Sequence, residues 1–171
     1  MGSQLAMNVA PFEHCVCQKL ANTQAACLNE HGFAEQGKKV KLTPKSGERV
    51  VSIVLDGCVF TDNQQKCDGL FLWVAGNRKV AALVELKGAG DIPHAFEQLA
   101  YVRHHRPEYR QLIERLNEAP GPKAIEKAFI VSNGLLSKPE KERLERQHSI
   151  RVKAVLHCEA ATPIPELRPL I

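Results

Sequence analysis

The pattern of apolar residues along the chain predicts a group of adjacent β-strands. Residues 49–60 are rich in Val and Ile, residues 69–75 are mostly apolar, and residues 80–87 are almost uniformly apolar. A strand that is buried on both faces has such a continuous apolar sequence. The Gly76-Asn77 pair between the second and third stretches is typical of a tight turn. The sequence therefore predicts a β-hairpin at this point.

Helical spacing and helix-terminating residues predict the other elements. Apolar side chains recur at helical spacing in residues 11–35, where Gly32 marks the end, and Asp91 and Pro93 are typical of a helix start. We expect helices over 11–35, 91–105, 107–117 and 139–148, and strands over 124–132 and 150–158. These elements predict a single α/β domain over residues 1–171. Residues 1–10 and the proline-containing 163–171 are expected to be flexible ends.

Three charged residues interrupt the apolar hairpin. Glu85 and Lys87 are two residues apart, so their side chains point to the same face of one strand. Asp68 opens the neighbouring strand, and the hairpin would bring all three together. Burying such charges costs several kcal/mol unless they are paired or bind a metal ion. A local salt bridge at the strand end is the alternative, but two acids beside one lysine favour a divalent cation and a phosphate.

Composition and charge restrict the class of protein without choosing a function. The chain has 171 residues, 44% of them hydrophobic and 25% charged, as in ordinary globular domains. A net charge of +4 is compatible with a polyanionic partner but does not require one. No apolar stretch has the length of a membrane span, and the N-terminus lacks the pattern of a signal peptide. We therefore expect a cytoplasmic protein with no membrane partner.

The six cysteines carry no recognisable metal-binding spacing. The sequence has no C-x-x-C, and no cysteine pairs with a histidine at the spacing of a zinc finger. In a chain that is not secreted, cysteines are usually reduced and buried as small core residues. We expect neither a zinc site nor a disulfide framework.

The helix predicted after the hairpin has a polar face. His94, Gln98 and Tyr101 lie on this face at three- and four-residue steps. Such a stripe beside carboxylates would hold phosphates or water. A solvent-exposed helix face explains His94 more simply, although His94 is kept as a candidate for contact with nucleic acid.

Basic and small residues flank the same helix. Arg103 and Arg106 belong to a basic run that either contacts phosphates or complements the helix dipole. Gly88 is either a simple turn residue or a position where a nucleic-acid backbone comes close.

The order of these elements and their motifs resemble the restriction-endonuclease-like superfamily. The predicted order is helix, three strands, helix and strand, and the motifs are Asp68, Glu85-Leu-Lys87 and Gln98-Leu-Ala-Tyr101. They resemble the PD-(D/E)xK signature and the Gln-bearing helix of RecB-like members, over about residues 49–131. Two departures stand out. Residue 67 is Cys instead of the signature's Pro, and the spacing from Gln98 to Tyr101 is one residue shorter than in the RecB pattern.

The resemblance implies a central mixed β-sheet flanked by helices, in α-β-β-β-α-β order, and a metal site. Asp68, Glu85 and the carbonyl of Leu86 would bind one or two Mg²⁺ or Mn²⁺ ions. Lys87 would orient the attacking water and offset charge that grows on the phosphorus. Gln98 would position Lys87 or the water.

Relatives in this superfamily often add an acid from the first helix. Glu13 and Glu30 are both candidates for this metal ligand, and Glu30 is the one we choose. Asp56 is either a turn residue or a further ligand.

These expectations converge on a metal-dependent nuclease, most simply a DNA endonuclease. The partner would be nucleic acid, with DNA favoured. A homodimer or a partner protein is expected because two sites are needed to cut both strands. The alternatives are an endoribonuclease that uses the same groups, and a nucleic-acid-binding or assembly module without turnover.

Overall fold

Two β-sheets and three α-helices form three layers in the computed structural model, which describes residues 7–19 and 24–171. The central sheet has five strands in the order β4-β5-β6-β7-β8, and a smaller sheet has the order β1-β2-β3. The strands of the large sheet are β4 (Glu48–Val54), β5 (Gly69–Ala75), β6 (Arg78–Lys87), β7 (Ile125–Ser132) and β8 (Ala154–His157). Those of the small sheet are β1 (Cys27–Asn29), β2 (Gly32–Glu35) and β3 (Lys38–Lys41).

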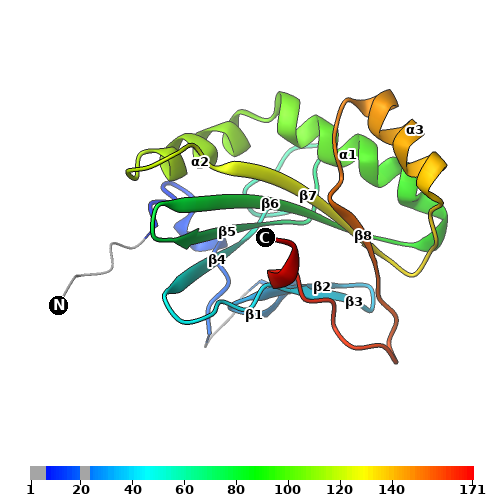
Figure 1. Ribbon diagram of the computed structural model, residues 1–171, viewed down its shortest axis with the longest axis horizontal. Helices are drawn as coiled ribbons and strands as arrows, with labels where there is room; N and C mark the ends of the chain where they lie inside the picture. Colours follow the sequence, from blue (N-terminus) through cyan, green and yellow to red (C-terminus); the bar gives the residue numbers. More distant parts are fainter. Residues whose placement is uncertain (1–6, 20–23) are drawn as a thin grey trace.

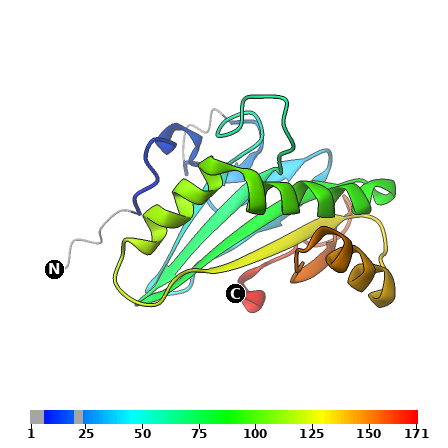
Figure 2. The ribbon, with the colours of Figure 1, turned by 90° about the horizontal axis from the view of Figure 1, so that it is seen from above.

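The central sheet is covered on both faces. Helices α1 (Ile92–His105), α2 (Pro107–Asn117) and α3 (Lys138–His148) lie over one face, and the small sheet lies over the other (Figures 1 and 2). Short 3₁₀ turns η1 (Glu13–Cys15), η2 (Ala89–Asp91) and η3 (Arg168–Leu170) connect or end the elements. The double cover explains why β6 is buried from Lys79 to Leu86. The nearly continuous apolar sequence of this strand predicted that environment.

The predicted hairpin and the mixed sheet are confirmed. Strands β4, β5 and β6 run antiparallel, and the turn of the β5–β6 hairpin is at residues 76 and 77. Strand β7 pairs parallel to β6 after α1 and α2, and β8 pairs parallel to β7 after α3. The α/β class is therefore correct, and the helices after the hairpin begin and end close to their predicted positions.

The helix predicted over residues 11–35 is wrong in the part of the chain that the structure describes. There the chain forms η1, β1 and β2. Val16 instead pairs with Ile53 in an antiparallel bridge, and the Cys17 amide donates to the Ser52 carbonyl at 2.8 Å. This segment thus extends the edge of the large sheet, and its helix-like apolar spacing arises from burial against β4. Residues 20–23 of the prediction lie outside the described residues.

Two disulfides fix this segment, contrary to the expectation of reduced cysteines. Cys15 is bonded to Cys58, and Cys17 is bonded to Cys27. The partners are brought together by tertiary structure, so the spacing of cysteines along the sequence did not reveal them. The other two cysteines, Cys67 and Cys158, are buried thiols as expected.

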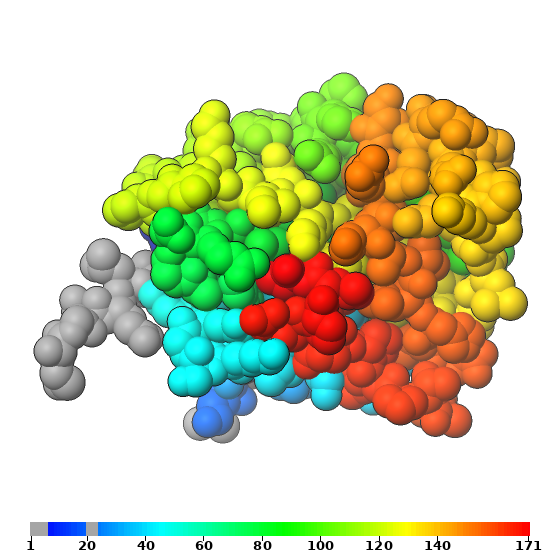
Figure 3. Space-filling view, in the orientation of Figure 1, coloured from blue at the N-terminus to red at the C-terminus, as the bar shows by residue number. Residues whose placement is uncertain are grey.

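The C-terminal residues also differ from their predicted behaviour. Residues 163–171 were expected to be loosely held, but Leu167 is fully buried against the small sheet. The Lys41 carbonyl accepts a hydrogen bond from the Leu167 amide at 2.9 Å, and Arg168 forms an ion pair with Glu48. Figure 3 shows this segment, in red, filling the face between residues near 45 and residues near 80. Its prolines prevent regular structure without preventing packing. Residues 1–6 of the other predicted flexible end lie outside the described part.

Nothing that could span a bilayer is found among the described helices: none is both long and apolar enough.

Candidate active site

Asp68 and Glu85 meet because of the register of the β5–β6 hairpin. Gly69 is paired with Val84, which places Asp68 beside Glu85 at the end of the two strands. The Leu86 amide donates a 2.7 Å hydrogen bond to Asp68 Oδ2. Asp68 is 6% exposed and Glu85 is 2% exposed. The sequence predicted this pair of buried acids, and the structure brings them together.

Burial disfavours the ionised form of the Asp68 and Glu85 carboxyl groups. For Asp68, burial and a hydrogen bond with Glu85 raise the pKa to about 8, although hydrogen bonds from Glu35 and the Leu86 amide oppose the rise. Burial also raises the pKa of Glu85 to about 7, against the opposing effects of Asp68 and the Lys87 charge. Glu85 Oε2 is buried and has no hydrogen-bond partner among the described residues. A buried acceptor in this condition costs free energy unless a proton or a cation satisfies it.

Glu35 is a third acid of the site, and the sequence did not identify it. It ends β2 in the small sheet and hydrogen-bonds to Asp68 across the two layers. This hydrogen bond, followed by burial, raises the pKa of Glu35 to about 7. The incorrect helix over residues 11–35 concealed it. The turn residues Gln36-Gly37 that follow it, typical of a hairpin, were the one local signal that could have found it.

Close packing of Phe33 on Gly69 holds β2 near Asp68. A Cβ atom added to Gly69 would lie 2.5 Å from the Phe33 ring, which is closer than two carbon atoms can approach. Phe33 is 1% exposed and also stacks on Phe71, with ring centroids 4.7 Å apart. The absent side chain of Gly69 therefore allows the small sheet to seat deeply enough for Glu35 to reach Asp68.

Lys87 lies on the same face of β6 as Glu85, as the alternation of the strand predicted. Its charge lowers the pKa values of both Glu35 and Glu85. Leu86 contacts Asp68 through its backbone N–H. Gly88 follows directly, and a Cβ atom there would meet nothing within 4 Å. Packing does not require a glycine at this position.

Glu30 is not brought to the acids. Its carboxyl is 40% exposed and lies 3.9 Å from His31 Nδ1, while its carbonyl accepts a hydrogen bond from Ser52 Oγ at 2.9 Å. Glu13, the other acid considered, is exposed in η1. The acid of this segment that interacts with Asp68 is instead Glu35, at the end of β2.

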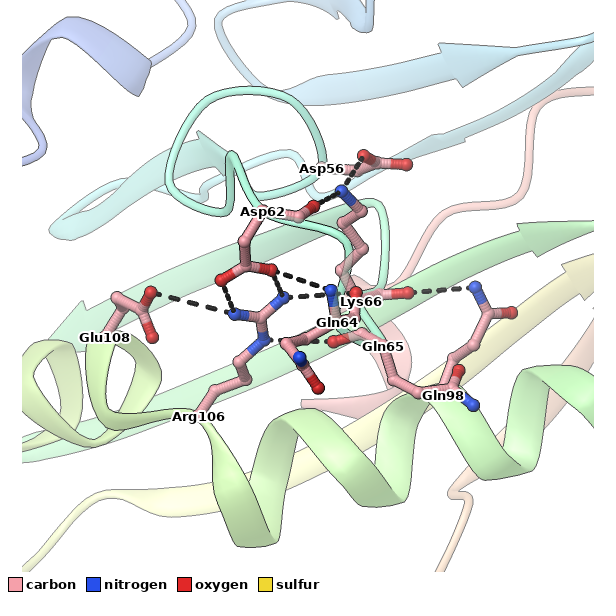
Figure 4. A network of polar contacts seen from close by, with 8 residues as sticks. All are labelled: Asp56, Asp62, Gln64, Gln65, Lys66, Gln98, Arg106 and Glu108. Carbon is pink, nitrogen blue, oxygen red and sulfur yellow. Dashed lines mark hydrogen bonds and ion pairs between the residues drawn. The ribbon is translucent and has the colours of Figure 1, made fainter.

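Gln98 and Tyr101 of α1 contact the segment that leads into Asp68. Gln98 Nε2 donates to the Lys66 carbonyl at 2.9 Å (Figure 4), and the Tyr101 hydroxyl donates to Gln64 Oε1 at 3.1 Å. Gln98 Oε1 is buried without a partner among the described residues. His94 is exposed and 3.2 Å from Glu97. Gln98 thus supports the backbone two residues before Asp68, and His94 lies on a solvated face.

Arg106 is committed to structural contacts, which corrects its predicted role in binding phosphates. Its guanidinium binds both carboxylate oxygens of Asp62, at 2.7 and 2.8 Å, and Nε donates to the Gln65 carbonyl at 3.0 Å (Figure 4). The residue is 5% exposed and lies 4.3 Å from the centroid of Phe60. Arg103 is also paired, with Nε 3.9 Å from Glu126 Oε1. Within the basic run, Arg106 is therefore a structural clamp on the loop before Asp68.

A pocket of about 450 Å³ lies between the two sheets, and Glu85 is not part of its lining. Glu35, Asp56 and Asp68 line its acidic side. Asp56 is exposed, and its Oδ1 lies 3.9 Å from Lys66 Nζ (Figure 4). The pocket gives solvent and small groups a path to the acids. Asp56 is both a residue of the turn after β4 and an acid within this pocket.

A second group of possible metal ligands is occupied by a disulfide. Among the described residues, only His14, Cys15 and Cys58 place three potential ligand atoms within 4.8 Å of one another. The two sulfur atoms are bonded to each other, which removes them as ligands. In the acidic cluster Asp68 is the shared member that contacts both Glu35 and Glu85. Glu35, Asp68 and Glu85 therefore form a row with Asp68 in the middle, and their carboxyl oxygens do not all lie within 4.8 Å of one another.

Comparisons with models of protein families, with curated proteins and with solved structures find no significant match to this chain.

Proposed function

We propose that this chain is a metal-dependent phosphodiesterase that cleaves nucleic acid, built on a restriction-endonuclease-like core. The observation that carries the proposal is the buried Glu85 carboxyl with an unpartnered oxygen, beside Asp68 and with Lys87 on the same face. Burying acids together costs free energy, and a fold gains nothing from that cost unless the acids bind something. A divalent cation is the ligand that relieves it.

The residues present fit magnesium or manganese. Hard divalent cations prefer carboxylate oxygens and keep several positions for water and phosphate oxygens. Asp68, Glu85 and Glu35 would hold the ion, with Asp56 in reach of the same pocket. When bound, such an ion polarises a phosphoryl oxygen and lowers the pKa of water. Because Glu35 and Glu85 lie on either side of Asp68, binding would draw both side chains toward it.

Lys87, the acids and Gln98 would have different roles in the reaction. The Lys87 ammonium would stabilise negative charge that develops on the phosphoryl group, because Lys87 ends β6 on the same face as Glu85. The raised pKa values of Asp68 and Glu85 mean that cation binding near neutral pH releases protons from the cluster. Gln98 helps to position Asp68, because it donates a hydrogen bond to the Lys66 carbonyl two residues before it.

The order of elements supports the restriction-endonuclease-like core from β4 onward. An antiparallel meander is followed by helices and a parallel strand; Asp68 directly precedes the second strand of the meander, and Glu85 lies in the third. The small sheet β1–β3 is formed by the segment where a first helix was expected, and in this proposal Glu35 would serve in place of that helix's acid. The net charge of +4 supports a polyanionic substrate, for which DNA is the first choice and RNA the alternative.

A cleavage assay with defined cations tests this proposal. Plasmid DNA, single-stranded DNA and RNA are incubated with the full chain in Mg²⁺, in Mn²⁺ and in EDTA. Asp68→Asn, Glu85→Gln and Lys87→Ala should each reduce cleavage at least about 100-fold. The two acid variants should keep their melting temperature, because the neutral forms are already favoured in the fold.

The exposed α3 variant Glu142→Gln is the matched control and should cleave normally. Absence of cleavage on all three substrates, or normal cleavage by Asp68→Asn, would overturn the assignment and leave a binding or assembly module as the interpretation.

A further inference from the structure

We propose that the pocket beside Glu35 and Asp68 is a subsite for one unpaired nucleobase, so that the substrate is single-stranded or locally unpaired nucleic acid. The inference rests on the proposed function, because it places the base next to the phosphate that the acids would act on. The volume of about 450 Å³ falls within the range of small-molecule sites, roughly 300 to 1,000 Å³. A space of this size holds a nucleoside and not a duplex.

The inner wall of the pocket is apolar and made of small residues. Ala25 and Ala26 in the turn before β1, Ala34 of β2 and Val54 of β4 contribute it. Small side chains leave room between the two sheets for a planar ring. Neither Lys nor Arg occurs among the described residues that line the pocket. Its interior therefore disfavours a phosphate and favours a neutral group, while the acids at its edge require a cation before any phosphate can approach.

Two amides stand at the pocket and can bond to the edge of a base. Gln24 and Gln36 both line it. An amide offers both donors and an acceptor, which is the combination that base edges require. Enzymes that act on nucleotides take bases out of the stack into pockets of this kind, where hydrogen bonds and apolar contacts hold them.

Gln36 has a backbone conformation that its residue type does not favour. Its φ is +49°, a left-handed value, and Gly37 follows with φ of +79°. Glycine or asparagine adopts this backbone geometry at a lower cost in free energy. The backbone therefore does not explain why a glutamine stands in the tight turn between β2 and β3. Contact between the side-chain amide of Gln36 and a base would explain the glutamine. Lys38 Nζ donates to the Gln36 carbonyl at 3.3 Å, which places a cation at the outer side of the turn, where a backbone phosphate would pass.

An enzyme that acts on single strands needs one site only. This removes the reason for expecting a homodimer, since no second strand has to be cut.

The test compares matched oligonucleotides. One labelled sequence is presented in Mg²⁺ as a single strand, as a duplex, and as a single strand with abasic residues that keep every phosphate. The full chain should cleave the single strand at least about 10-fold faster than the duplex, and the abasic strand at least about 10-fold more slowly than the intact one. Equal rates on the three would refute the base subsite and leave the phosphodiesterase standing.

Two variants separate the base contact from the fold. Ala34→Phe fills the pocket and should abolish the preference for the single strand. Gln36→Gly should weaken that preference while maintaining or raising the melting temperature, since glycine favours this backbone. A Gln36→Gly protein that keeps the full preference would contradict the role of the amide. Glu142→Gln is again the control.

Binding of free nucleosides tests the pocket without any cleavage. Adenosine, cytidine, guanosine and thymidine are titrated into the full chain in EDTA, with chemical shifts followed by NMR, and inorganic phosphate is titrated in parallel. At least one nucleoside should shift resonances of residues 24–26 and 34–36, phosphate should not, and Ala34→Phe should remove the effect. If no substrate is cut but a nucleoside binds here, the proposed function fails and the base pocket stands. If no nucleoside binds, the pocket proposal fails whatever the cleavage result.

Discussion

Glu35 and Asp68 hydrogen-bond across two different β-sheets, one residue at the end of β2 and the other directly before β5. Their contact joins the small sheet to the hairpin that carries Glu85 and Lys87. The bond needs a proton on one of the two carboxyl groups, and the pKa of each is raised, to about 7 for Glu35 and about 8 for Asp68. The small sheet thus completes the acidic site as well as covering the core.

The first prediction concerns the acid that the sequence did not reveal. Glu35→Gln should weaken Mn²⁺ binding roughly 10-fold or more, because it removes one carboxylate from the row, as changes around metal ligands commonly do. Isothermal titration calorimetry with Mn²⁺ measures this effect. Glu30→Gln is the matched control, since Glu30 is an acid of the same segment whose carboxyl points toward His31. Equal Mn²⁺ affinities for the two variants would remove Glu35 from the site.

The second prediction is that a divalent cation stabilises the fold more at high pH. The carboxyl pKa values of Asp68 and Glu85 rise from 3.8 and 4.5 to about 8 and about 7, so the folded chain holds protons that the unfolded chain releases. Because the folded state binds more protons, stability contributed by these groups is full below pH 4 and is lost as pH rises toward 8. A bound cation replaces the protons and offsets this loss.

Thermal melting with and without Mg²⁺, between pH 5.5 and pH 8.5, measures this linkage. At a cation concentration 100 times Kd the gain is about 2.7 kcal/mol, which is roughly 5 to 10 °C for a chain of this size. The gain should shrink toward pH 5.5, where protons compete with the cation. In Glu85→Gln the gain should be smaller at every pH. A gain that is equal at both ends of the pH range would exclude the acids as the binding site.

The hairpin and its charges could be predicted because they depend on local sequence. A glutamate and a lysine in an otherwise apolar strand are conspicuous, and strand alternation fixes the face on which they lie. Glu35 could not be predicted, because its contact with Asp68 depends on the depth to which Phe33 packs on Gly69. Long-range packing of this kind leaves no periodic signal.

Burial explains the other errors of the sequence interpretation. Apolar residues of the segment that begins at Phe12 have helical spacing, yet Cys15 is bonded to Cys58 in another loop and Cys17 is bonded to Cys27 at the start of β1. Arg106 stands in a basic run, but the turn that holds Asp62 folds over it. The loop between β4 and β5 brings Asp62 to Arg106, so this arginine faces a partner and not solvent. The sequence did not predict the path of this loop.

The third prediction is that the Cys17–Cys27 disulfide supports activity more than stability. Its partners are 10 residues apart, which corresponds to about 2.7 kcal/mol of stabilisation in the chain-entropy account, whereas the 43-residue separation of Cys15–Cys58 gives about 4 kcal/mol. Cys27 directly follows Ala26, which lines the pocket. Replacing Cys17 and Cys27 by Ser should therefore release that wall.

Melting temperature and cleavage rate are compared for the two double variants, Cys17→Ser with Cys27→Ser and Cys15→Ser with Cys58→Ser. The first should lose proportionally more activity, and the second should lose more stability. Dithiothreitol should reproduce both effects in the unmodified chain. Because such bonds persist where thiols are oxidised, loss of activity on reduction would argue against a role in the cytoplasm. A first double variant with full activity would show that the disulfide does not shape the site.

The last prediction concerns Arg106, which the sequence offered as a phosphate contact or a complement to the helix dipole, and which the structure buries. Its guanidinium forms hydrogen bonds with Asp62, with the Gln65 carbonyl and with the Gln64 carbonyl, and it lies over the Phe60 ring. Arg106→Ala leaves these carbonyls and the ring without their partner. The free energy of unfolding should therefore fall by roughly 3 kcal/mol, and Arg106→Lys should recover only part of it, because lysine lacks the planar fork.

Nucleic-acid binding by Arg106→Ala, measured at a temperature where it remains folded, should keep its dependence on salt. Each phosphate contact that is lost lowers the slope of log K against log salt by about 0.9 on duplex DNA and about 0.7 on single strands. Lys38→Gln, at the outer side of the pocket turn, is the matched comparison and should lower the slope by that amount. A reduced slope in folded Arg106→Ala would restore this residue to the binding surface, and the clamp that holds the loop before Asp68 would then have a second role.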